Sequence, residues 1–500
     1  MDGFAPLAPH EPVAGQDAAA NDLRRRIGLV AAPVVFALAW WLAPESLSPQ
    51  AGRVLAVLAA TLVLWLTEAV PVAVTAVFAP AAAVVLGVGP ADKVFAPFGN
   101  PLLFLFLGAF LLAAAAERTR LDRLLAERLF PHATTSPKRT LVTTTLVTAG
   151  MSSVFSNTAT TAMMMPVVRA AVARLGPKSQ AVGVLSAAYA SSLGGVLTPI
   201  GTPPNLLAMA ALSQYAKVDV PFFVWTVIAA PMAAILLGQW IVMLLATLRR
   251  EGVPESSAPT PTAPVDRQRP PPLDLGQRMA LVAVAVAAVG WLLPGVLEML
   301  WTGKDPLVKS VKAALPEGVV AVLAASLLFM LPLRRGPGRR PLLTWPEAVH
   351  IDWGTILLFG GGLALGEQVF QTGLSQWIGN VVIDLTGVKS EWGLTILFTV
   401  TALVLSELAS NTATAALICP LAVMTAQQVG VSPVAPCIAA ALAASMGFLM
   451  PISTAPNAIV YGTGKVPLAT MLRTGIWLDL TGLVIIPPVV MGMTRMVGLR

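Results

Sequence analysis

Long apolar runs alternate with short polar segments along nearly the whole chain. About eleven of these runs are long enough to cross roughly 30 Å of hydrocarbon as helices. They cover residues 27–43, 54–66, 72–88, 102–116, 182–212, 222–248, 279–297, 319–333, 355–370, 438–460 and 476–493. The pattern predicts an all-α polytopic membrane protein with about eleven transmembrane helices.

Two further apolar stretches, 141–175 and 395–429, are each interrupted by the same polar word, Ser-Asn-Thr-Ala-Thr, at 156–160 and 410–414. Each interruption leaves two apolar arms of about 15 residues, which are short for a full span. Two short arms joined by a polar tip are typical of a re-entrant helical hairpin. We therefore expect one such hairpin in each stretch.

The two hairpins belong to an internal duplication. Their Ser-Asn-Thr words lie 254 residues apart, Pro204-Asn205 recurs as Pro456-Asn457 after 252 residues, and 105–108 matches 358–361 after 253. Three matches at nearly one offset predict a repeated structural unit. Each unit is expected to contain one hairpin and one transmembrane helix that is broken at a Gly/Pro-rich segment, 198–205 or 451–457.

The basic residues indicate that the two units have opposite orientations. Five of them flank the first hairpin and one lies before the second: Lys138, Arg139, Arg169, Arg174 and Lys178, and then Lys389. Because Lys and Arg are retained in the cytoplasm, the first hairpin is expected to enter from inside and the second from outside. Inverted repeats of this kind occur in many secondary transporters. Lys304, Lys309 and Lys312 are an exception, because this arrangement would place them outside the cell.

These signals divide the chain into four segments. Residues 1–26 form a cytoplasmic N-terminal tail, 27–248 a first membrane half, 249–278 a cytoplasmic Pro-rich linker, and 279–500 a second membrane half. The expected location is the inner (plasma) membrane, with the N-terminus in the cytoplasm and the C-terminus outside.

Composition narrows the class of protein. Of the 500 residues, 56% are hydrophobic and only 11% are charged, which excludes a water-soluble enzyme. The two cysteines, Cys419 and Cys437, cannot build a disulfide framework, and the three histidines lie in polar connections. The basic residues behind the net charge of +7 lie at the ends of apolar runs. This position is typical of residues that set membrane orientation, so we expect no nucleic-acid partner.

The four expected breaks mark the candidate site, because a helix is broken in hydrocarbon only where protein or ligand satisfies the freed backbone groups. At a hairpin tip the first arm ends in carbonyls that suit a cation, and the second begins with N–H groups that suit an anion. Ser, Asn and Thr side chains add oxygens and donors to both: Ser156, Asn157, Thr158, Ser410, Asn411 and Thr412. The alternative is that these residues only cap the second arms.

Charge balance favours sodium as a co-transported ion. The arms have no Lys or Arg near the tips, so an anion bound there must be neutralised by helix dipoles and cations. Hard cations prefer the carbonyl and hydroxyl oxygens that the tips offer. Of two carboxylates at the edges of apolar runs, Glu68 is expected to make a structural hydrogen bond, and Glu407 to support the second tip or relay protons.

The chain resembles the divalent anion:sodium symporter family, which carries dicarboxylates, tricarboxylates or sulfate. The matching motifs are both Ser-Asn-Thr words, the break at 201–205, the segment 65–71 (Trp-Leu-Thr-Glu-Ala-Val-Pro), and Asp352-Trp353 leading into Phe359-Gly360-Gly361-Gly362. They extend from Trp65 to Asn457. The resemblance implies a homodimer in which a transport domain moves against a fixed scaffold.

The same resemblance implies the ligands of the site. The first Na⁺ site would consist of Ser152, Ser156, Asn157 and Gly201, and the second of Ser406, Ala409, Asn411 and Ser453. The substrate carboxylates would contact Asn157, Thr158, Thr202, Asn411, Thr412 and Thr454. Ala455 stands where the family's pattern usually has a proline.

The expected function is sodium-coupled import of a divalent organic anion, a C4-dicarboxylate such as succinate, by alternating access. A sodium-independent dicarboxylate exchanger and a sulfate or tricarboxylate carrier are alternatives within the class. A channel is the alternative from another class, because inverted re-entrant repeats also occur in channels. An enzyme is not expected, since the sequence offers no nucleophile with a base and no metal cluster at one bilayer depth.

Overall fold

The computed structural model describes residues 16–121, 124, 136–253, 272–300, 305–333 and 340–499. Within these ranges the chain is all-helical apart from an isolated antiparallel bridge between Pro332 and Pro341, which confirms the predicted fold class. Much of the expected N-terminal tail (1–26) and of the Pro-rich linker (249–278) lies outside the described residues.

The described helices up to residue 250 come first. They are α1 (Gln16–Trp41), α2 (Pro49–Thr67), α3 (Val72–Val85), α4 (Ala91–Phe95), η1 (Ala96–Gly99), α5 (Pro101–Arg118), α7 (Pro137–Ser152), α8 (Asn157–Val172), α9 (Pro177–Gly195), α10 (Pro203–Ala211), the π-helix η2 (Leu212–Ala216) and α11 (Phe222–Arg250).

Helices α12 to α22 follow. They are α12 (Leu275–Leu300), α13 (Pro306–Ala314), α14 (Glu317–Leu327), α15 (Trp345–Ala348), α16 (Trp353–Gln371), α17 (Leu374–Thr386), α18 (Glu391–Leu408), α19 (Asn411–Val429), α20 (Val434–Ala444), α21 (Ala455–Tyr461) and α22 (Leu468–Met496).

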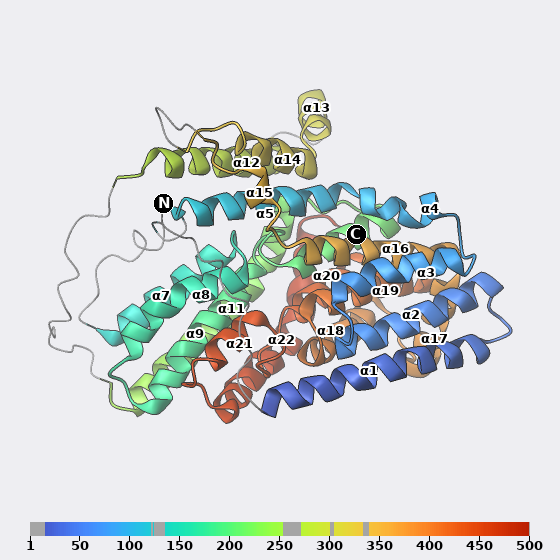
Figure 1. Ribbon diagram of the computed structural model, residues 1–500, viewed down its shortest axis with the longest axis horizontal. Helices are drawn as coiled ribbons and strands as arrows, with labels where there is room; N and C mark the ends of the chain where they lie inside the picture. The colour runs from blue at the N-terminus through green and yellow to red at the C-terminus, as the bar shows by residue number, and fades with distance from the viewer. Residues whose placement is uncertain are drawn as a thin grey trace.

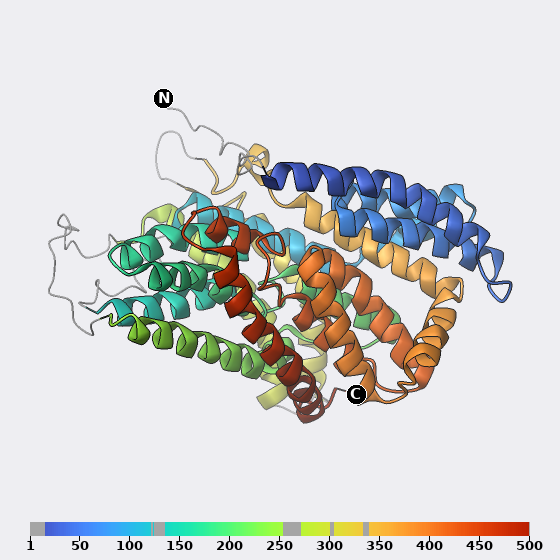
Figure 2. The ribbon, with the colours of Figure 1, turned by 90° about the horizontal axis from the view of Figure 1, so that it is seen from below.

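Helices from the two parts of the chain interlock. Helix α16 packs on α3 and α14 packs on α5, so neither part is separate from the other. Figures 1 and 2 show α7, α8 and α9 towards one end of the molecule's long axis, and α18 and α19 beyond its centre towards the other end. Helix α16 packs against α19, α3 packs against α16, and α2 joins α3 to α1, which is outermost of this group (Figures 1 and 2).

Helix breaks occur at the four places that the sequence indicates. A short turn joins α7 to α8 around the first Ser-Asn-Thr word, and a shorter one joins α18 to α19 around the second. The long apolar run 182–212 divides into α9 and α10, and the run 438–460 divides into α20 and α21. In each hairpin the second arm continues as a helix through an internal proline, Pro166 or Pro420.

The expected number of about eleven spans is not confirmed. Among the described residues, seven helices are long and apolar enough to cross a membrane, or eight if α13 and α14, bent by 58°, form one span. Hydropathy overestimated the number because some apolar runs are not single long helices. Helix α3 has only 14 residues, and the broken runs end up as pairs of shorter helices.

Glycines allow close approaches between helices. A Cβ at Gly108 would lie 2.5 Å from the backbone carbon of Ala321 in α14. A Cβ at Gly361 would lie 2.0 Å from the carbonyl oxygen of Ala76 in α3. At such distances the helix backbones themselves would have to move apart.

We expect Gly361→Ala to lower the thermal stability of the detergent-solubilised protein, because it overpacks the α3–α16 contact at a cost of about 1–3 kcal/mol. Gly238→Ala is the matched control, since Gly238 is an exposed helical glycine with no atom within 4 Å of its added Cβ. A melting curve of each variant checks the difference. Equal melting temperatures would contradict the packing role of Gly361.

Candidate functional site

The first hairpin tip is organised by Asn157, the first residue of α8. Ser152, at the end of α7, donates a hydrogen bond from its hydroxyl to Asn157 Oδ1 at 2.6 Å. The amide also fits against Gly195, where an added Cβ would lie 2.3 Å from Asn157 Oδ1. A Cβ at Gly201 would lie 2.4 Å from the Gly195 carbonyl oxygen. Ser152, Asn157 and Gly201 therefore gather around the C-terminal end of α9.

The second tip repeats this arrangement 254 residues later. Ser406 donates to Asn411 Oδ1 at 2.6 Å, and its hydroxyl also lies 2.5 Å from the Ala444 carbonyl oxygen at the end of α20. Gly447 takes the place of Gly195, since an added Cβ there would lie 3.2 Å from Asn411 Oδ1 and 3.0 Å from Ser453 Cβ. Ala409 is the buried C-cap of α18.

The structure argues against the capping alternative. Ser156 and Ser410 are the N-cap residues of α8 and α19, but neither side chain makes the cap hydrogen bond. The Oδ1 atoms of the two asparagines accept from serines of the preceding arms instead of holding the start of the helix. The hydroxyls of Ser156 and Ser410 thus remain available to a ligand.

The broken helices are capped by the asparagines of the Pro-Asn pairs. Asn205 Nδ2 lies 3.1 Å from the Gly195 carbonyl oxygen and 2.8 Å from that of Thr198. Asn457 Nδ2 lies 2.8 Å from the Gly447 carbonyl oxygen and 3.0 Å from that of Met450. Asn205 therefore pairs the carbonyls left free after the end of α9, and Asn457 pairs those left free after the end of α20.

Four buried side-chain oxygens have no hydrogen-bond partner, and they occupy equivalent positions in the two repeats. The Oδ1 atoms of Asn205 and Asn457 have no hydrogen-bond partner, and neither do the hydroxyls of Thr160 and Thr414, the last residues of the two polar words. Because unpaired buried polar atoms are rare in folded proteins, a set that recurs in both repeats indicates a region built to receive ligand or water.

The broken helices pack across the two repeats. Helix α21 packs against α8 and α9, and α10 packs against α19 and α20, so the second half of each broken helix contacts the hairpin and the first half of the broken helix of the other repeat. Thr202 and Thr454 are the N-caps of α10 and α21. Thr158 and Thr412 occupy the first turns of α8 and α19. All the residues expected from the resemblance thus lie at the tips or at the breaks.

An open cleft of about 490 Å³ borders the first hairpin between α8 and α21. Its lining follows one face of α8, with Ile459 opposite: Ala162, Met165, Pro166 and Arg169. Arg169 lies about 18 Å along the helix axis from Asn157, so it is not part of the tip.

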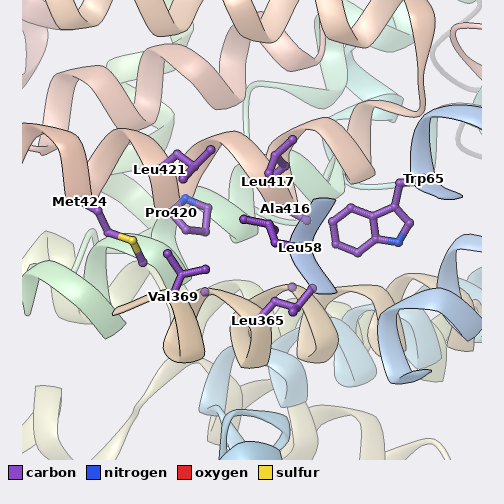
Figure 3. Close-up of a pocket in the computed structure, with 11 residues that line it drawn as sticks. Leu58, Trp65, Leu365, Val369, Ala416, Leu417, Pro420, Leu421 and Met424 are labelled. Atoms are coloured by element: carbon purple, nitrogen blue, oxygen red, sulfur yellow. The ribbon is translucent and has the colours of Figure 1, made fainter. Parts of the chain in front are cut away.

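The same face of α19 is closed. Ala416 and Pro420, which match Ala162 and Pro166 at the repeat offset, line a cavity of about 20 Å³ between α2, α16 and α19. Figure 3 shows the apolar side chains around it, including Leu58 and Trp65 of α2 and Leu365 of α16. The cavity is too small and too apolar for a dicarboxylate.

The two carboxylates discussed from the sequence have structural partners. Glu68 is the C-cap of α2 and forms an ion pair with Arg24 at 3.3 Å, which is a structural role of the kind expected from the sequence. Glu407 accepts hydrogen bonds from the Leu449 N–H at 3.0 Å and from the Ser453 hydroxyl at 2.7 Å. Its support therefore goes to the break after α20, and through Ser453 to the residues around the second tip.

Sequence reasoning missed several residues of this region. It did not single out Gly195 and Gly447, although they recur at the same 252-residue offset as the Pro-Asn pairs, which could have revealed them. It also missed Thr198, whose hydroxyl donates to the Ser153 carbonyl oxygen and ties the first break to the first tip. Asp479, a buried carboxylate in α22, lies inside an apolar run and gave no repeat signal.

Paired helical hairpins and paired broken helices, with the polar groups gathered at the breaks, define a multi-pass membrane transporter. A family model described as the transmembrane region of sodium:sulfate symporters matches residues 23–499. The chain belongs to this family, as the resemblance of its motifs indicated.

Curated relatives carry a more specific name. The sodium-dependent dicarboxylate transporter SdcS of Staphylococcus saprophyticus is 30% identical over 486 residues, which cover 93% of this chain and 90% of that protein. SdcS of Staphylococcus aureus strain USA300 is 30% identical over 477 residues, covering 92% of this chain and 89% of the relative.

Two solved structures share the fold at low sequence identity. The YdaH transporter of Alcanivorax borkumensis superposes with a TM-score of 0.51 at 16% identity, covering 81% of this chain and 86% of YdaH. MtrF of Neisseria gonorrhoeae gives a TM-score of 0.52 at 14% identity, covering 96% of this chain and 95% of MtrF. These similarities support the fold class only.

Proposed function

We propose that this chain imports a C4-dicarboxylate such as succinate together with Na⁺ by alternating access. The observation that carries the proposal is the pair of identical tips, each with an uncommitted N-cap hydroxyl and a Ser–Asn hydrogen bond and without a basic residue in its polar word. The names of the SdcS relatives support both the ion and the substrate class.

We assign one Na⁺ to each tip. The first site comprises Ser152, Ser156, Asn157 and Gly201, and the second comprises Ser406, Ala409, Asn411 and Ser453. The contacts of Asn157 and Gly201 with Gly195, and of Asn411 and Ser453 with Gly447, support the assignment, as do the Ser–Asn hydrogen bonds at both tips. The asparagine Oδ1 atoms already accept one hydrogen bond each, and a carbonyl oxygen has a second lone pair for a cation.

We place the substrate between the two tips. One carboxylate would meet Asn157, Thr158 and Thr202, and the other would meet Asn411, Thr412 and Thr454. The N-termini of α8, α10, α19 and α21 begin at these residues and favour negative charge. Two Na⁺ ions supply the positive charge that the polar words lack.

The substrate class is tested by uptake of labelled succinate into proteoliposomes under an inward Na⁺ gradient, with unlabelled sulfate, citrate and succinate as competitors. We expect succinate to compete strongly and sulfate to compete weakly. Sulfate belongs in the comparison because the family's description names it. Stronger competition by sulfate or citrate would assign the site to that anion instead.

The proposal includes a homodimer in the cell membrane, an N-terminus in the cytoplasm and a C-terminus outside. The basic residues around the first hairpin support this orientation, and the family resemblance supports the dimer. The four proposed segments of the chain keep the boundaries that the sequence suggests.

Inverted topology can be tested at two positions related by the repeat. Lys178 is exposed in the first turn of α9, and Ser432, 254 residues later, precedes α20. Lys178 is the better choice over its neighbour Ser179, which is buried and donates its N–H to Glu251 at 2.9 Å. We expect Lys178→Cys and Ser432→Cys, each in a background without Cys419 and Cys437, to react with an impermeant thiol reagent from opposite sides of the membrane. Reaction from one side would refute the inverted repeat.

A further inference from the structure

The second half of the molecule contains a buried carboxylate to which no N–H group or hydroxyl donates, and whose neighbour is another acid. Asp479 lies in α22 with 2% of its surface exposed, and neither of its carboxylate oxygens accepts a hydrogen bond. Its carboxyl lies within side-chain interaction range of Glu407, which is itself 7% exposed. Two buried acidic groups therefore face each other in a part of the protein that excludes water.

Within the described part of the chain, no Lys or Arg forms an ion pair with either acid. The ion pairs formed among the described residues join Arg24 to Glu68, Arg26 to Asp22, Arg118 to Glu347 and Arg495 to Glu391, and leave both buried carboxylates out. Tyr189 lies near both acids, but its hydroxyl is 2.9 Å from the Phe448 carbonyl oxygen, to which it donates. Adjacent buried carboxylates without a positive charge are strongly unfavourable, so the pair needs a bound cation or a proton.

Glu407 is already oriented for binding. Its two oxygens are fixed by the Leu449 N–H and the Ser453 hydroxyl, and each carboxylate oxygen has a further lone pair. Asp479, on α22, adds two oxygens that accept no hydrogen bond. A set of hard oxygen ligands with more negative charge than either hairpin tip suits a small hard cation.

This pair breaks the symmetry of the repeats. The position that matches Glu407 at the 254-residue offset is Ser153, and α11, the long helix that follows the first broken helix, contains no Asp or Glu. The hairpin tips occur twice, whereas the carboxylate pair occurs once. A site of this kind adds one ion to the two that the duplicated tips would bind.

We propose that Glu407 and Asp479 form a third Na⁺ site, which is coupled to the second tip through Ser453. The inference rests on the proposed sodium-coupled function and adds the ion that makes transport of a dianion electrogenic. Ser453 joins the sites because it donates to Glu407 and is also assigned to the second Na⁺. Loss of the third ion is therefore expected to alter the stoichiometry without removing sodium dependence.

The test compares wild type with Asp479→Asn in proteoliposomes, measuring the charge moved for each succinate and the Na⁺ dependence of uptake. We expect the wild type to move about one net positive charge for each succinate, and the variant to be electroneutral. The Hill coefficient for Na⁺ should fall by about one, while uptake at zero potential still requires Na⁺. Glu367→Gln is the matched control and should leave both quantities unchanged, because Glu367 pairs with Gln214 and Gln371 at 2.8 and 2.7 Å.

Three outcomes would overturn the third site. In the first, the charge moved for each succinate is the same in Asp479→Asn as in wild type. In the second, the charge moved by the wild type changes with external pH but not with Na⁺ concentration, which would assign a proton to the pair. The third is equal Na⁺-dependent thermal stabilisation of wild type, Asp479→Asn and Glu407→Gln in detergent without substrate. This binding measurement also covers variants that do not transport. Wild-type uptake that is independent of Na⁺ would instead refute the proposed function, and the binding measurement would still judge the site.

Discussion

Replacing Na⁺ by K⁺ or choline on both sides of the membrane should abolish succinate uptake into proteoliposomes. The physical reason is charge. Succinate is mostly a dianion at neutral pH, and neither polar word at the tips contains a basic side chain. The helix dipoles belong to the protein and add no net charge to the transport cycle, so only co-transported cations offset the charge that the dianion carries across the membrane. Measuring initial rates in the two media checks the prediction.

The membrane potential should also drive uptake when Na⁺ is present. Moving one elementary charge through the membrane is worth about 2.3 kcal/mol per 100 mV, so an inside-negative potential opposes a bare dianion by about twice that amount. Two Na⁺ cancel this opposition, and a third reverses it. An inside-negative potential set with K⁺ and valinomycin should therefore accelerate uptake.

A contrary result has a defined meaning. Uptake that proceeds without Na⁺ and requires a dicarboxylate preloaded inside the vesicles would establish an exchanger. The cation roles proposed for Ser152, Ser156, Ser406 and Ser453 would then be wrong, and the Ser–Asn hydrogen bonds would serve only to hold the tips. Ser156→Ala provides a finer measure, because loss of one ligand should raise the Na⁺ concentration needed for the half-maximal rate.

Asn157→Ala and Asn411→Ala should each reduce succinate uptake at least about tenfold while leaving the yield of folded protein intact. Each substitution removes a polar partner in a partly buried site, worth about 1–3 kcal/mol, where about 1.4 kcal/mol corresponds to a factor of ten in rate. It also leaves the Ser152 or Ser406 hydroxyl without its acceptor at the tip. Uptake rates and size-exclusion profiles of the purified variants check the two parts of the prediction.

Asn380→Ala is the control for these substitutions. Asn380 is exposed on α17, where its Oδ1 accepts from Gln428 Nε2 at 3.3 Å, and it lies outside the hairpins and the breaks. We expect it to transport normally. Near-normal uptake by either tip variant would show that the corresponding asparagine has a local structural role alone, and the assignment of a site to that tip would have to be withdrawn.

The sequence predicts the breaks well because broken helices in apolar surroundings need unusual residues. The two polar words and the Pro-Asn pairs stand out against apolar flanks, and their recurrence supplies independent confirmation. The number of spans was less predictable. Hydropathy is blind to whether an apolar run of 31 residues, such as 182–212, forms one long helix or two short ones packed inside the protein.

Details of the site depend on contacts that no local pattern records. The bond from Ser406 to Asn411 follows from the shape of the tip, whereas the approach of Gly447 to that asparagine needs the folded break after α20. Asp479 faces Glu407 across a separation of 72 residues, and nothing in the composition of α22 announces this pairing. Tertiary packing alone brings such groups together.

The unequal surroundings of Ala162 and Ala416 bear on how the duplicated gene could diverge. In the present arrangement Ala162 borders open space, and a larger residue would fit there, whereas Ala416 is enclosed by α2 and α16. In the proposed cycle the α8 face must close in its turn, so a residue that fits the open form would obstruct the closed one. The closed form, and not the open one, would therefore set the limit on side-chain size at both alanines.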